Sequence, residues 1–169
     1  MNPLTFAEQK REQMISLLAM LAGQWQGEGS GEYPTIASFE YRESLRFALD
    51  EARPLLHYLQ NTRRFKAEVG DYVPSHWETG YLRWLEGDRV EIANAQIGGR
   101  VEVMEGTMEE TAGGLVLRLR STHFANDERM GDATRTFTLA GDTLHYVMYM
   151  QTTKVPHLAL HLEATLQSQ

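Results

Sequence analysis

The stretch that decides the fold reads Gly23-Gln24-Trp25-Gln26-Gly27-Glu28-Gly29-Ser30-Gly31-Glu32-Tyr33-Pro34-Thr35-Ile36. Before it the apolar residues recur at helical spacing, and after it they recur at every second position. Glycine at alternate positions leaves one face of a strand bare, so another strand, a ligand or a helix can approach its backbone closely. Trp25 lies on the same face, one step ahead of Gly27. We expect the strand to end near Pro34, because proline cannot donate to a ladder.

A helix is predicted over residues 3–21. Thr5 and Glu8 have the spacing of a capping box, in which the hydroxyl accepts from a backbone amide and the carboxylate reaches back. The apolar residues of this segment form one stripe, namely Met14, Ile15, Leu17, Leu18 and Leu21. Gly23 is a suitable C-terminal stop. We expect the helix to act as a lid or plug on the structure that follows.

The rest of the chain predicts an all-β fold with ten strands, identified by alternation and by the turn residues between them. The expected strands are 25–32, 37–50, 55–65, 76–85, 89–96, 100–110, 115–122, 133–139, 143–151 and 158–166, with longer loops at 70–74 and 125–132. Short turns without a second helix favour antiparallel neighbours throughout. Such strands avoid exposed edges by closing into an up-and-down barrel, whose interior would hold a ligand cavity. A two-sheet sandwich with a filled core is the alternative.

Composition narrows the class of protein. The chain has 169 residues, 42% of them hydrophobic, which fits a single domain over 1–169 with its barrel at about 24–167. The absence of cysteine excludes disulfides, thiolate metal sites and a cysteine nucleophile. The net charge of −7 is spread along the chain, which argues against a nucleic-acid partner. With no signal peptide and no apolar run long enough to cross a membrane, we expect a cytoplasmic protein.

Six histidines are the candidates for metal chemistry: His57, His76, His123, His145, His157 and His161. None forms the helical pair of a zinc protease, and there is no Gly-x-Ser-x-Gly elbow. On a strand, His157 and His161 would share a face about 13 Å apart, too far for one metal. His157 follows Pro156 at a strand start, where its imidazole could aim at the barrel mouth and bind iron or zinc. A plain surface histidine is the alternative, and these patterns alone predict only a small-molecule-binding barrel.

Several motifs together resemble the nitrobindins, haem-binding barrels related to the C-terminal domain of the human THAP-domain protein of that family. The resemblance covers nearly all of residues 15–166. Its opening signature is Gly23-x-Trp25-x-Gly27-x-Gly29, running on through Gly31-x-Tyr33-Pro34-Thr35-Ile36. Further matches are Ser75-His76-Trp77-Glu78-Thr79-Gly80-Tyr81, Ile92-Ala93-Asn94-Ala95-Gln96-Ile97-Gly98-Gly99-Arg100-Val101-Glu102-Val103, and Met150-Gln151-Thr152-Thr153 followed by Pro156-His157-Leu158.

The resemblance implies a ten-stranded barrel of the calycin or fatty-acid-binding-protein type that holds one haem b near its open end. It further implies His157 as the axial iron ligand. Around the haem it implies Thr35, His76, Gln96 and Met148, with Arg129 as a cation near a propionate. The family binds nitric oxide on ferric haem and isomerises peroxynitrite to nitrate, and the chemistry belongs to the cofactor.

Two functions from different classes are therefore expected. The first is a haem protein, an isomerase or sensor, that takes diatomic or anionic nitrogen species as ligands. The second is a carrier without enzymatic activity, which would hold a fatty acid or another small apolar molecule in the same cavity. His157 is the residue expected to decide between them. Either protein could act as a homodimer, without nucleic-acid or membrane partners.

Overall fold

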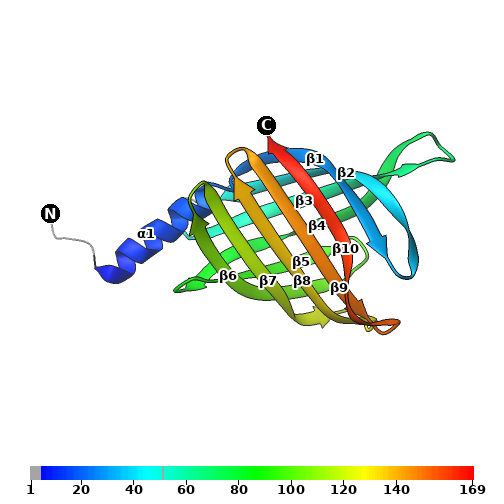
Figure 1. Cartoon of the computed structure of the whole chain (residues 1–169). Coiled ribbons are helices and arrows are strands. Elements are labelled where there is room, and N and C mark those ends of the chain that lie inside the picture. Colours follow the sequence, from blue (N-terminus) through cyan, green and yellow to red (C-terminus); the bar gives the residue numbers. More distant parts are fainter. Residues whose placement is uncertain (1–4, 51) are drawn as a thin grey trace.

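The structure is a computed structural model that describes residues 5–50 and 52–169. In this part of the chain ten antiparallel strands close into one barrel, in the order β1-β10-β9-β8-β7-β6-β5-β4-β3-β2 (Figure 1). Strands that follow one another in sequence are neighbours, and β1 closes the ring by pairing with β10. The prediction of an up-and-down barrel is confirmed, and the sandwich alternative is wrong.

The bounds of the elements follow the expected pattern closely. The helix α1 spans Phe6–Ala19. The strands are β1 Gly23–Tyr33, β2 Ile36–Leu49, β3 Leu55–Lys66, β4 Asp71–Glu86, β5 Arg89–Gln96, β6 Val101–Thr111, β7 Gly114–Ala125, β8 Met130–Ala140, β9 Thr143–Thr152 and β10 Val155–Ser168. The largest difference is in β4, which begins at Asp71 and not at residue 76. Strand β10 begins before Pro156 and not after it, and β7 and β8 extend into the predicted loop at 125–132, leaving only 126–129 between them.

Helix α1 covers one end of the barrel. The capping box forms as predicted, because the Thr5 hydroxyl accepts from the Glu8 amide and the Glu8 carboxylate accepts from the Thr5 amide at 2.7 Å. Residues 3 and 4 of the predicted helix lie outside the described residues. The buried residues of the C-terminal half join the core of the barrel, and the indole Nε1 of Trp25 donates to the Leu21 carbonyl at 2.8 Å. The N-terminal half projects away from the strands (Figure 1).

The bare face of β1 is the seam of the barrel. A Cβ atom on Gly27 would lie 2.0 Å from the backbone oxygen of Thr165 on β10. A Cβ on Gly29 would lie 2.4 Å from the ring of Tyr41 on β2. Side chains at these positions would therefore push away both neighbours of β1, and glycine permits the close approach that the sequence suggested.

The predicted loop at 70–74 is wrong. Strands β3 and β4 continue as a hairpin beyond the barrel wall, with the turn at 67–70, and this hairpin projects at the upper right of Figure 1. Pairing of Arg63 with Pro74 continues the ladder past a register shift. The Arg42 guanidinium lies 4.2 Å from the Tyr72 ring centre, a cation–π contact that ties the hairpin to β2.

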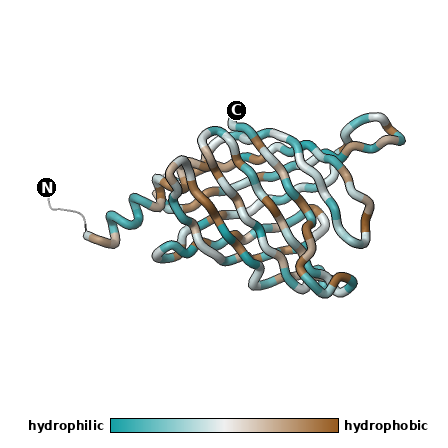
Figure 2. The backbone as a smooth tube through the Cα atoms, in the orientation of Figure 1, coloured by the Kyte–Doolittle hydropathy of each residue, from teal (hydrophilic) through white to brown (hydrophobic). Residues whose placement is uncertain are grey.

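The barrel interior changes character along its length. Hydropathy alternates along the strands in Figure 2, as expected when successive side chains face opposite sides of a sheet. Near α1 the inward side chains are apolar and form a single core cluster. Further along the strands the inward positions carry a polar layer, made of Glu43, Gln60, Thr62, Glu78, Asn94, Gln96, Glu102 and Arg135. A polar layer this deep needs a reason beyond packing, because unpaired buried polar groups are costly.

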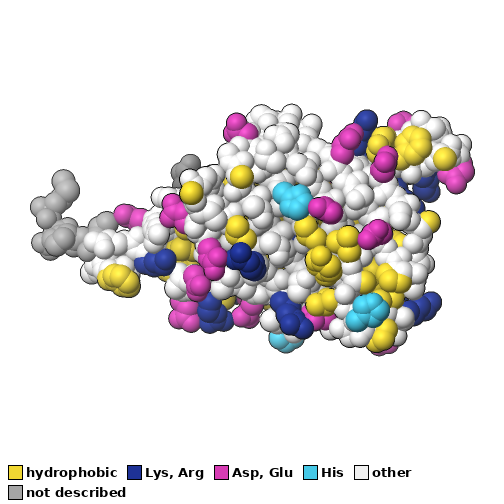
Figure 3. Space-filling model, viewed as in Figure 1, with side chains coloured by type: hydrophobic (Ala, Val, Ile, Leu, Met, Phe, Trp, Pro, Cys, Tyr) yellow, Lys and Arg dark blue, Asp and Glu magenta, His cyan; other side chains and the backbone are white. Residues whose placement is uncertain are grey.

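Acidic and basic side chains are interspersed on the face shown in Figure 3. Within residues 5–50 and 52–169, no helix combines the length and the apolar character needed to cross a bilayer.

Candidate functional site

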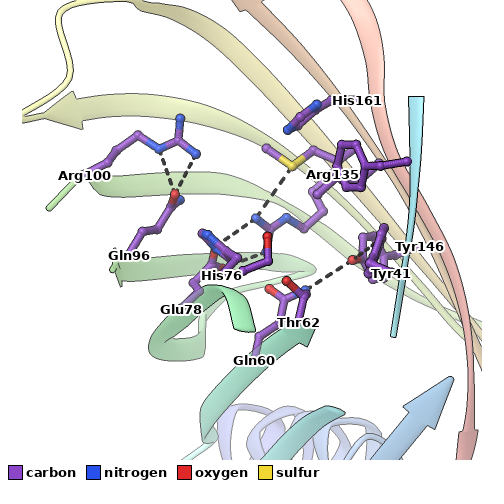
Figure 4. A pocket seen from close by; sticks show the side chains of 14 residues that line it. Tyr41, Gln60, Thr62, His76, Glu78, Gln96, Arg100, Arg135, Tyr146 and His161 are labelled. Atoms are coloured by element: carbon purple, nitrogen blue, oxygen red, sulfur yellow. Dashed lines mark hydrogen bonds and ion pairs between the residues drawn. The ribbon is translucent and has the colours of Figure 1, made fainter. Parts of the chain in front are cut away.

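One cavity lies inside the barrel at the level of the polar layer and has a volume of about 240 Å³. Figure 4 shows its side chains converging on one space, with Arg100 and Gln96 at one end and Tyr41 and Tyr146 at the other. The lining residues are Phe39, Tyr41, Gln60, Thr62, Ser75, His76, Glu78, Gln96, Arg100, Arg135, Tyr146, Met148, His161 and Leu162.

A second cavity of about 380 Å³ adjoins the first toward the β1–β2 and β9–β10 turns. Its lining residues are Tyr33, Thr35, Ile36, Arg100, Asp127, Arg129, Met130, Met150, Thr152, Thr153, Lys154 and His161. Two residues, Arg100 and His161, line both cavities. We refer to the two as the inner and the outer cavity.

A β-bulge in β10 turns His161 into both cavities. Leu160 pairs with Tyr149 and Leu162 pairs with Met148, so two steps on β10 face one step on β9 and His161 is the extra residue. Leu162 faces inward because Met148, its partner, lines the inner cavity. A bulge changes the face of every residue on one side of it, which strict alternation cannot anticipate.

The His161 imidazole is suited to bind a metal. Burial lowers its pKa, and nearby positive charge on Arg100 lowers it further, against a hydrogen bond to the backbone of Glu32 that favours the protonated ring. Its Nδ1 is buried and has no hydrogen-bond partner among the described residues. The Tyr33 ring holds it edge-on, with the ring centres 5.6 Å apart. A neutral imidazole with a free nitrogen is the form that ligates metals.

His157, the predicted ligand, is elsewhere. Its side chain is exposed and it lines neither cavity. The cause is a second irregularity in β10, between Val155 and Ala159, where four steps along β10 face two steps along β9. The expectation that the imidazole of His157 aims at the barrel mouth is therefore corrected: the bulged segment turns it outward, and His161 takes the inward place.

The other predicted pocket residues do line the cavities. His76, Gln96 and Met148 face the inner cavity, and Thr35 and Arg129 face the outer one. His76 keeps the inward alternation of Glu78, and the register shift in β4 lies beyond it, at Ser75. The remaining three histidines line neither cavity, namely His57, His123 and His145.

Arg100 and Arg129 differ as candidate cations. The Arg100 guanidinium donates to Gln96 Oε1 at 2.6 and 3.0 Å and is largely buried. Arg129 is exposed and forms a close ion pair with Asp127 at 2.8 Å, while Arg100 lies 3.8 Å from that carboxylate. Arg100 is thus the cation positioned toward both cavities, and the sequence reasoning did not identify it.

A buried ion pair crosses the floor of the inner cavity. Arg135 donates to the two carboxylate oxygens of Glu78 at 2.8 and 3.3 Å, and the Tyr58 hydroxyl donates to the same carboxylate at 2.5 Å. Burial alone would raise the pKa of Glu78, but Arg135 and hydrogen bonds, including one from His76, hold that pKa well below its usual range. The floor therefore carries a matched pair of charges.

A second buried carboxyl, Glu43, has a different environment. The Tyr146 hydroxyl donates to it at 2.6 Å and the Gln60 amide donates at 2.8 Å. The hydroxyl of Tyr41 lies 2.9 Å from that of Tyr146. Burial raises its pKa to about 7, and none of the described cations forms an ion pair with it.

These buried charges had a signal in the sequence. Glu43 has the same strand parity as Tyr41 and Leu45, which the alternation of 37–50 assigns to the inner face. Arg135 likewise shares its parity with Phe137. A charged residue at a core-facing position is expensive to bury unless it is paired or functional. The presence of Glu43 and Arg135 at core-facing positions could therefore have predicted a polar, charged cavity floor.

Among the described residues, no group of three or more His, Asp or Glu side chains could hold a bare metal ion. The single free imidazole of His161 suits instead a metal that brings most of its own ligands. Haem is such a group, because its porphyrin supplies four ligands and the protein supplies an axial one.

Comparison with known proteins agrees with this arrangement. Residues 14–168 match the family described as "THAP4-like, heme-binding beta-barrel domain". A relative named peroxynitrite isomerase, from Nocardia farcinica (strain IFM 10152), is 41% identical over 156 residues, covering 90% of this chain and 89% of that protein. Peroxynitrite isomerase 2 of Mycobacterium marinum (strain ATCC BAA-535 / M) is 37% identical, covering 90% of this chain and 93% of that one. The crystal structure of Rv2717c from M. tuberculosis superimposes with a TM-score of 0.83 at 34% identity, covering 92% and 97% of the two chains.

Proposed function

This chain belongs to the family of THAP4-like haem-binding β-barrel domains, and on that premise we propose that it binds one haem b and isomerises peroxynitrite to nitrate. The observation that carries the proposal is His161, a half-buried imidazole at the junction of two cavities whose buried Nδ1 has no hydrogen-bond partner among the described residues. Peroxynitrite and nitrate contain the same atoms and the same charge. The reaction therefore needs no redox partner and no second substrate.

We propose His161 as the axial iron ligand, in place of His157. Its lowered pKa keeps the ring neutral near pH 7, so that metal binding does not have to displace a proton. Two features fix its direction: the bulge at Leu160–Leu162 and the edge of the Tyr33 ring. His157 lacks both burial and a cavity.

The outer cavity suits the propionate end of haem. It presents Arg100, Arg129 and Lys154, and these cations can pair with carboxylates at an opening to solvent. Thr35, Thr152 and Thr153 add hydroxyl donors beside them. Phe39, Met148 and Leu162 of the inner cavity offer apolar contacts to the ring. Ile36, Met130 and Met150 of the outer cavity offer further ones.

When bound, haem would supply an iron coordination position at which nitric oxide or peroxynitrite can bind. The chain itself would hold the imidazole, exclude bulk water from the inner cavity and present Arg100 to an approaching anion. The net charge of −7 would repel an anion at long range, so this local cation matters for its capture. Nitric oxide is neutral and would not be affected by that repulsion.

The alternative function, a carrier of a fatty acid, fits the cavity less well. A carboxylate head group in a barrel needs a free buried cation or several free donors. Arg135 is the buried cation of the inner cavity, and both of its Nη atoms already bind Glu78. The floor leaves only its Nε without a partner among the described residues. The floor is thus filled by an internal carboxylate, and Arg100, nearer the opening, is the cavity cation left for a ligand carboxylate.

Peroxynitrite decay by stopped flow, with products analysed as nitrate and nitrite, tests the activity. The haemin-loaded protein is expected to speed the decay and to yield nitrate, while the protein without haemin should do neither. An unchanged decay rate with haemin bound would reject the isomerase and leave a haem protein of another kind. Fatty-acid binding by the same preparation would favour the carrier.

We further propose that the protein acts in the cytoplasm, which is consistent with the absence of cysteine. A homodimer and the lack of a nucleic-acid or membrane partner also stay predictions. Cell fractionation and light scattering of the purified protein test location and assembly directly.

A further inference from the structure

Behind the wall of the inner cavity lies an acid that the proposed chemistry does not use. We propose that Glu43 is a proton-controlled gate on the charge of the cavity: with its proton the cavity accepts small anions, and without it the cavity favours neutral ligands. This deepens the proposed function, on which it rests, by saying when the site takes an anion such as peroxynitrite and when it takes a neutral molecule such as nitric oxide.

The geometry places Glu43 one side chain away from the ligand space. The hydroxyl of Tyr146 and the amide of Gln60 both donate to its carboxyl group, at 2.6 and 2.8 Å, and both residues line the inner cavity. Tyr41, which also lines it, extends the chain of hydroxyl groups. Only 4% of Glu43 is exposed, so a charge there is screened poorly by water.

The groups around Glu43 do not neutralise it. On β1 its partner is Gly27, and on β3 its partner is Thr62, neither of which is charged. The cation that acts on Glu43, Arg135 on β8, is bound to Glu78 on β4, so that pair adds no net charge. The remaining neighbours are uncharged, namely Gln60 on β3, Tyr41 on β2 and Tyr146 on β9. Ionisation of Glu43 therefore adds one uncompensated negative charge behind the cavity wall.

The protonation of Glu43 would change within the physiological range, since burial raises its pKa to about 7. A unit charge roughly 10 Å away, at an effective dielectric constant of about 25, changes an anion's affinity on the order of tenfold. A neutral ligand of the same shape is not affected. The gate is thus a change of ligand preference with pH, without movement of the backbone.

Two dyes of nearly the same shape measure this preference in the full chain before haemin is added. They are 8-anilinonaphthalene-1-sulfonate, an anion, and N-phenyl-1-naphthylamine, which lacks the sulfonate and is neutral. From about pH 6 to about pH 8.5 we expect the ratio of the anionic dye's affinity to the neutral dye's affinity to fall on the order of tenfold. The Glu43→Gln substitution should remove most of this fall. Glu109→Gln, an exposed acid paired with Arg118, is the matched control and should behave as the parent chain.

The Glu43→Gln variant retains every other ionisable group of the two cavities, so their contribution is common to both chains. A ratio that is independent of pH in the parent chain, or one that falls equally in Glu43→Gln, would overturn the gate. Should Glu43→Gln fail to fold, Tyr146→Phe provides the second test. It removes a hydrogen bond that stabilises the ionised carboxyl, so the midpoint of the fall should move to higher pH.

In the haemin-loaded protein the same comparison uses fluoride, an anion, on the ferric form and carbon monoxide, a neutral ligand, on the ferrous form. Fluoride affinity should fall with pH in a Glu43-dependent way, and carbon monoxide affinity should not. A failure of haemin uptake would reject the proposed function and leave the dye experiment to judge the gate. Normal haemin uptake with no Glu43-dependent change would reject the gate alone.

Discussion

The buried Glu43 carboxyl should make the stability of the apoprotein fall as pH rises through neutrality. Its pKa is raised from 4.5 to about 7 in the folded chain. Between those values the folded chain keeps a proton that the unfolded chain has already released. The free energy of unfolding therefore decreases from about pH 4.5 upward, and this contribution becomes constant at about pH 8.

The size of this effect follows from the two pKa values. They differ by about 2.5, and one pKa unit corresponds to about 1.4 kcal/mol, so the full loss is about 3 kcal/mol. Most of it falls between about pH 5 and pH 8. This is a large share of the 5–15 kcal/mol by which a domain is usually stable.

Urea unfolding of the parent chain and Glu43→Gln, at several pH values across that window, isolates the contribution. The amide cannot ionise but can still accept from Tyr146 or Gln60, so the variant should lack the decline while other titrating groups act on both chains. The difference between the two chains should therefore change by roughly 2–3 kcal/mol from about pH 5 to pH 8. A constant difference would show that Glu43 is ionised in the folded chain and would refute this reasoning.

Further predictions concern the ion pair, the seam and the outer cavity. Glu78→Gln leaves the buried Arg135 without its partner and should cost about 3–5 kcal/mol in urea unfolding at pH 7, whereas an unchanged midpoint would mean that water already screens the pair. Gly27→Ala forces a methyl group toward the β10 backbone and should lower the free energy of unfolding by about 1–3 kcal/mol or more. Gly98→Ala, in open space, should lower it by less than about 0.5 kcal/mol. Equal thermal midpoints for the two variants would contradict the close approach of β1 to β10 at Gly27. Arg100→Ala should weaken haemin binding by about 1–3 kcal/mol in a spectroscopic titration, and equal affinity would remove Arg100 from the propionate site.

The fold was largely predictable from the sequence because alternation is a strong signal in a closed antiparallel barrel. Turn residues marked most strand ends, and the bare glycine face marked the seam. The hairpin beyond the barrel was not predicted, because Gly70 and Pro74 both suggested a loop. In the structure the turn is at Gly70, where φ is +70°, and Pro74 lies next to a register shift.

The site was less predictable, because β-bulges determine which side chains of β10 face the cavities. His161 points into the cavities only through the extra residue in β10, and no feature of the local sequence announces that bulge. The resemblance placed the ligand at His157, whereas the structure turns His161 of the same strand into the cavities. Charged positions such as Glu43 and Arg135 could have been found from their strand parity. Their partners could not, since Glu78 and Arg135 are brought together from β4 and β8 by closure of the barrel.

The assignment of the iron ligand is tested most directly by the absorption spectrum of the haemin-loaded chain, compared among the parent, His161→Ala and His157→Ala. If His161 binds the iron, we expect a histidine-ligated Soret band in the parent and in His157→Ala. We expect loss of that band in His161→Ala, with recovery when free imidazole is added to fill the vacated position. Loss of the band in His157→Ala with retention in His161→Ala would contradict the account.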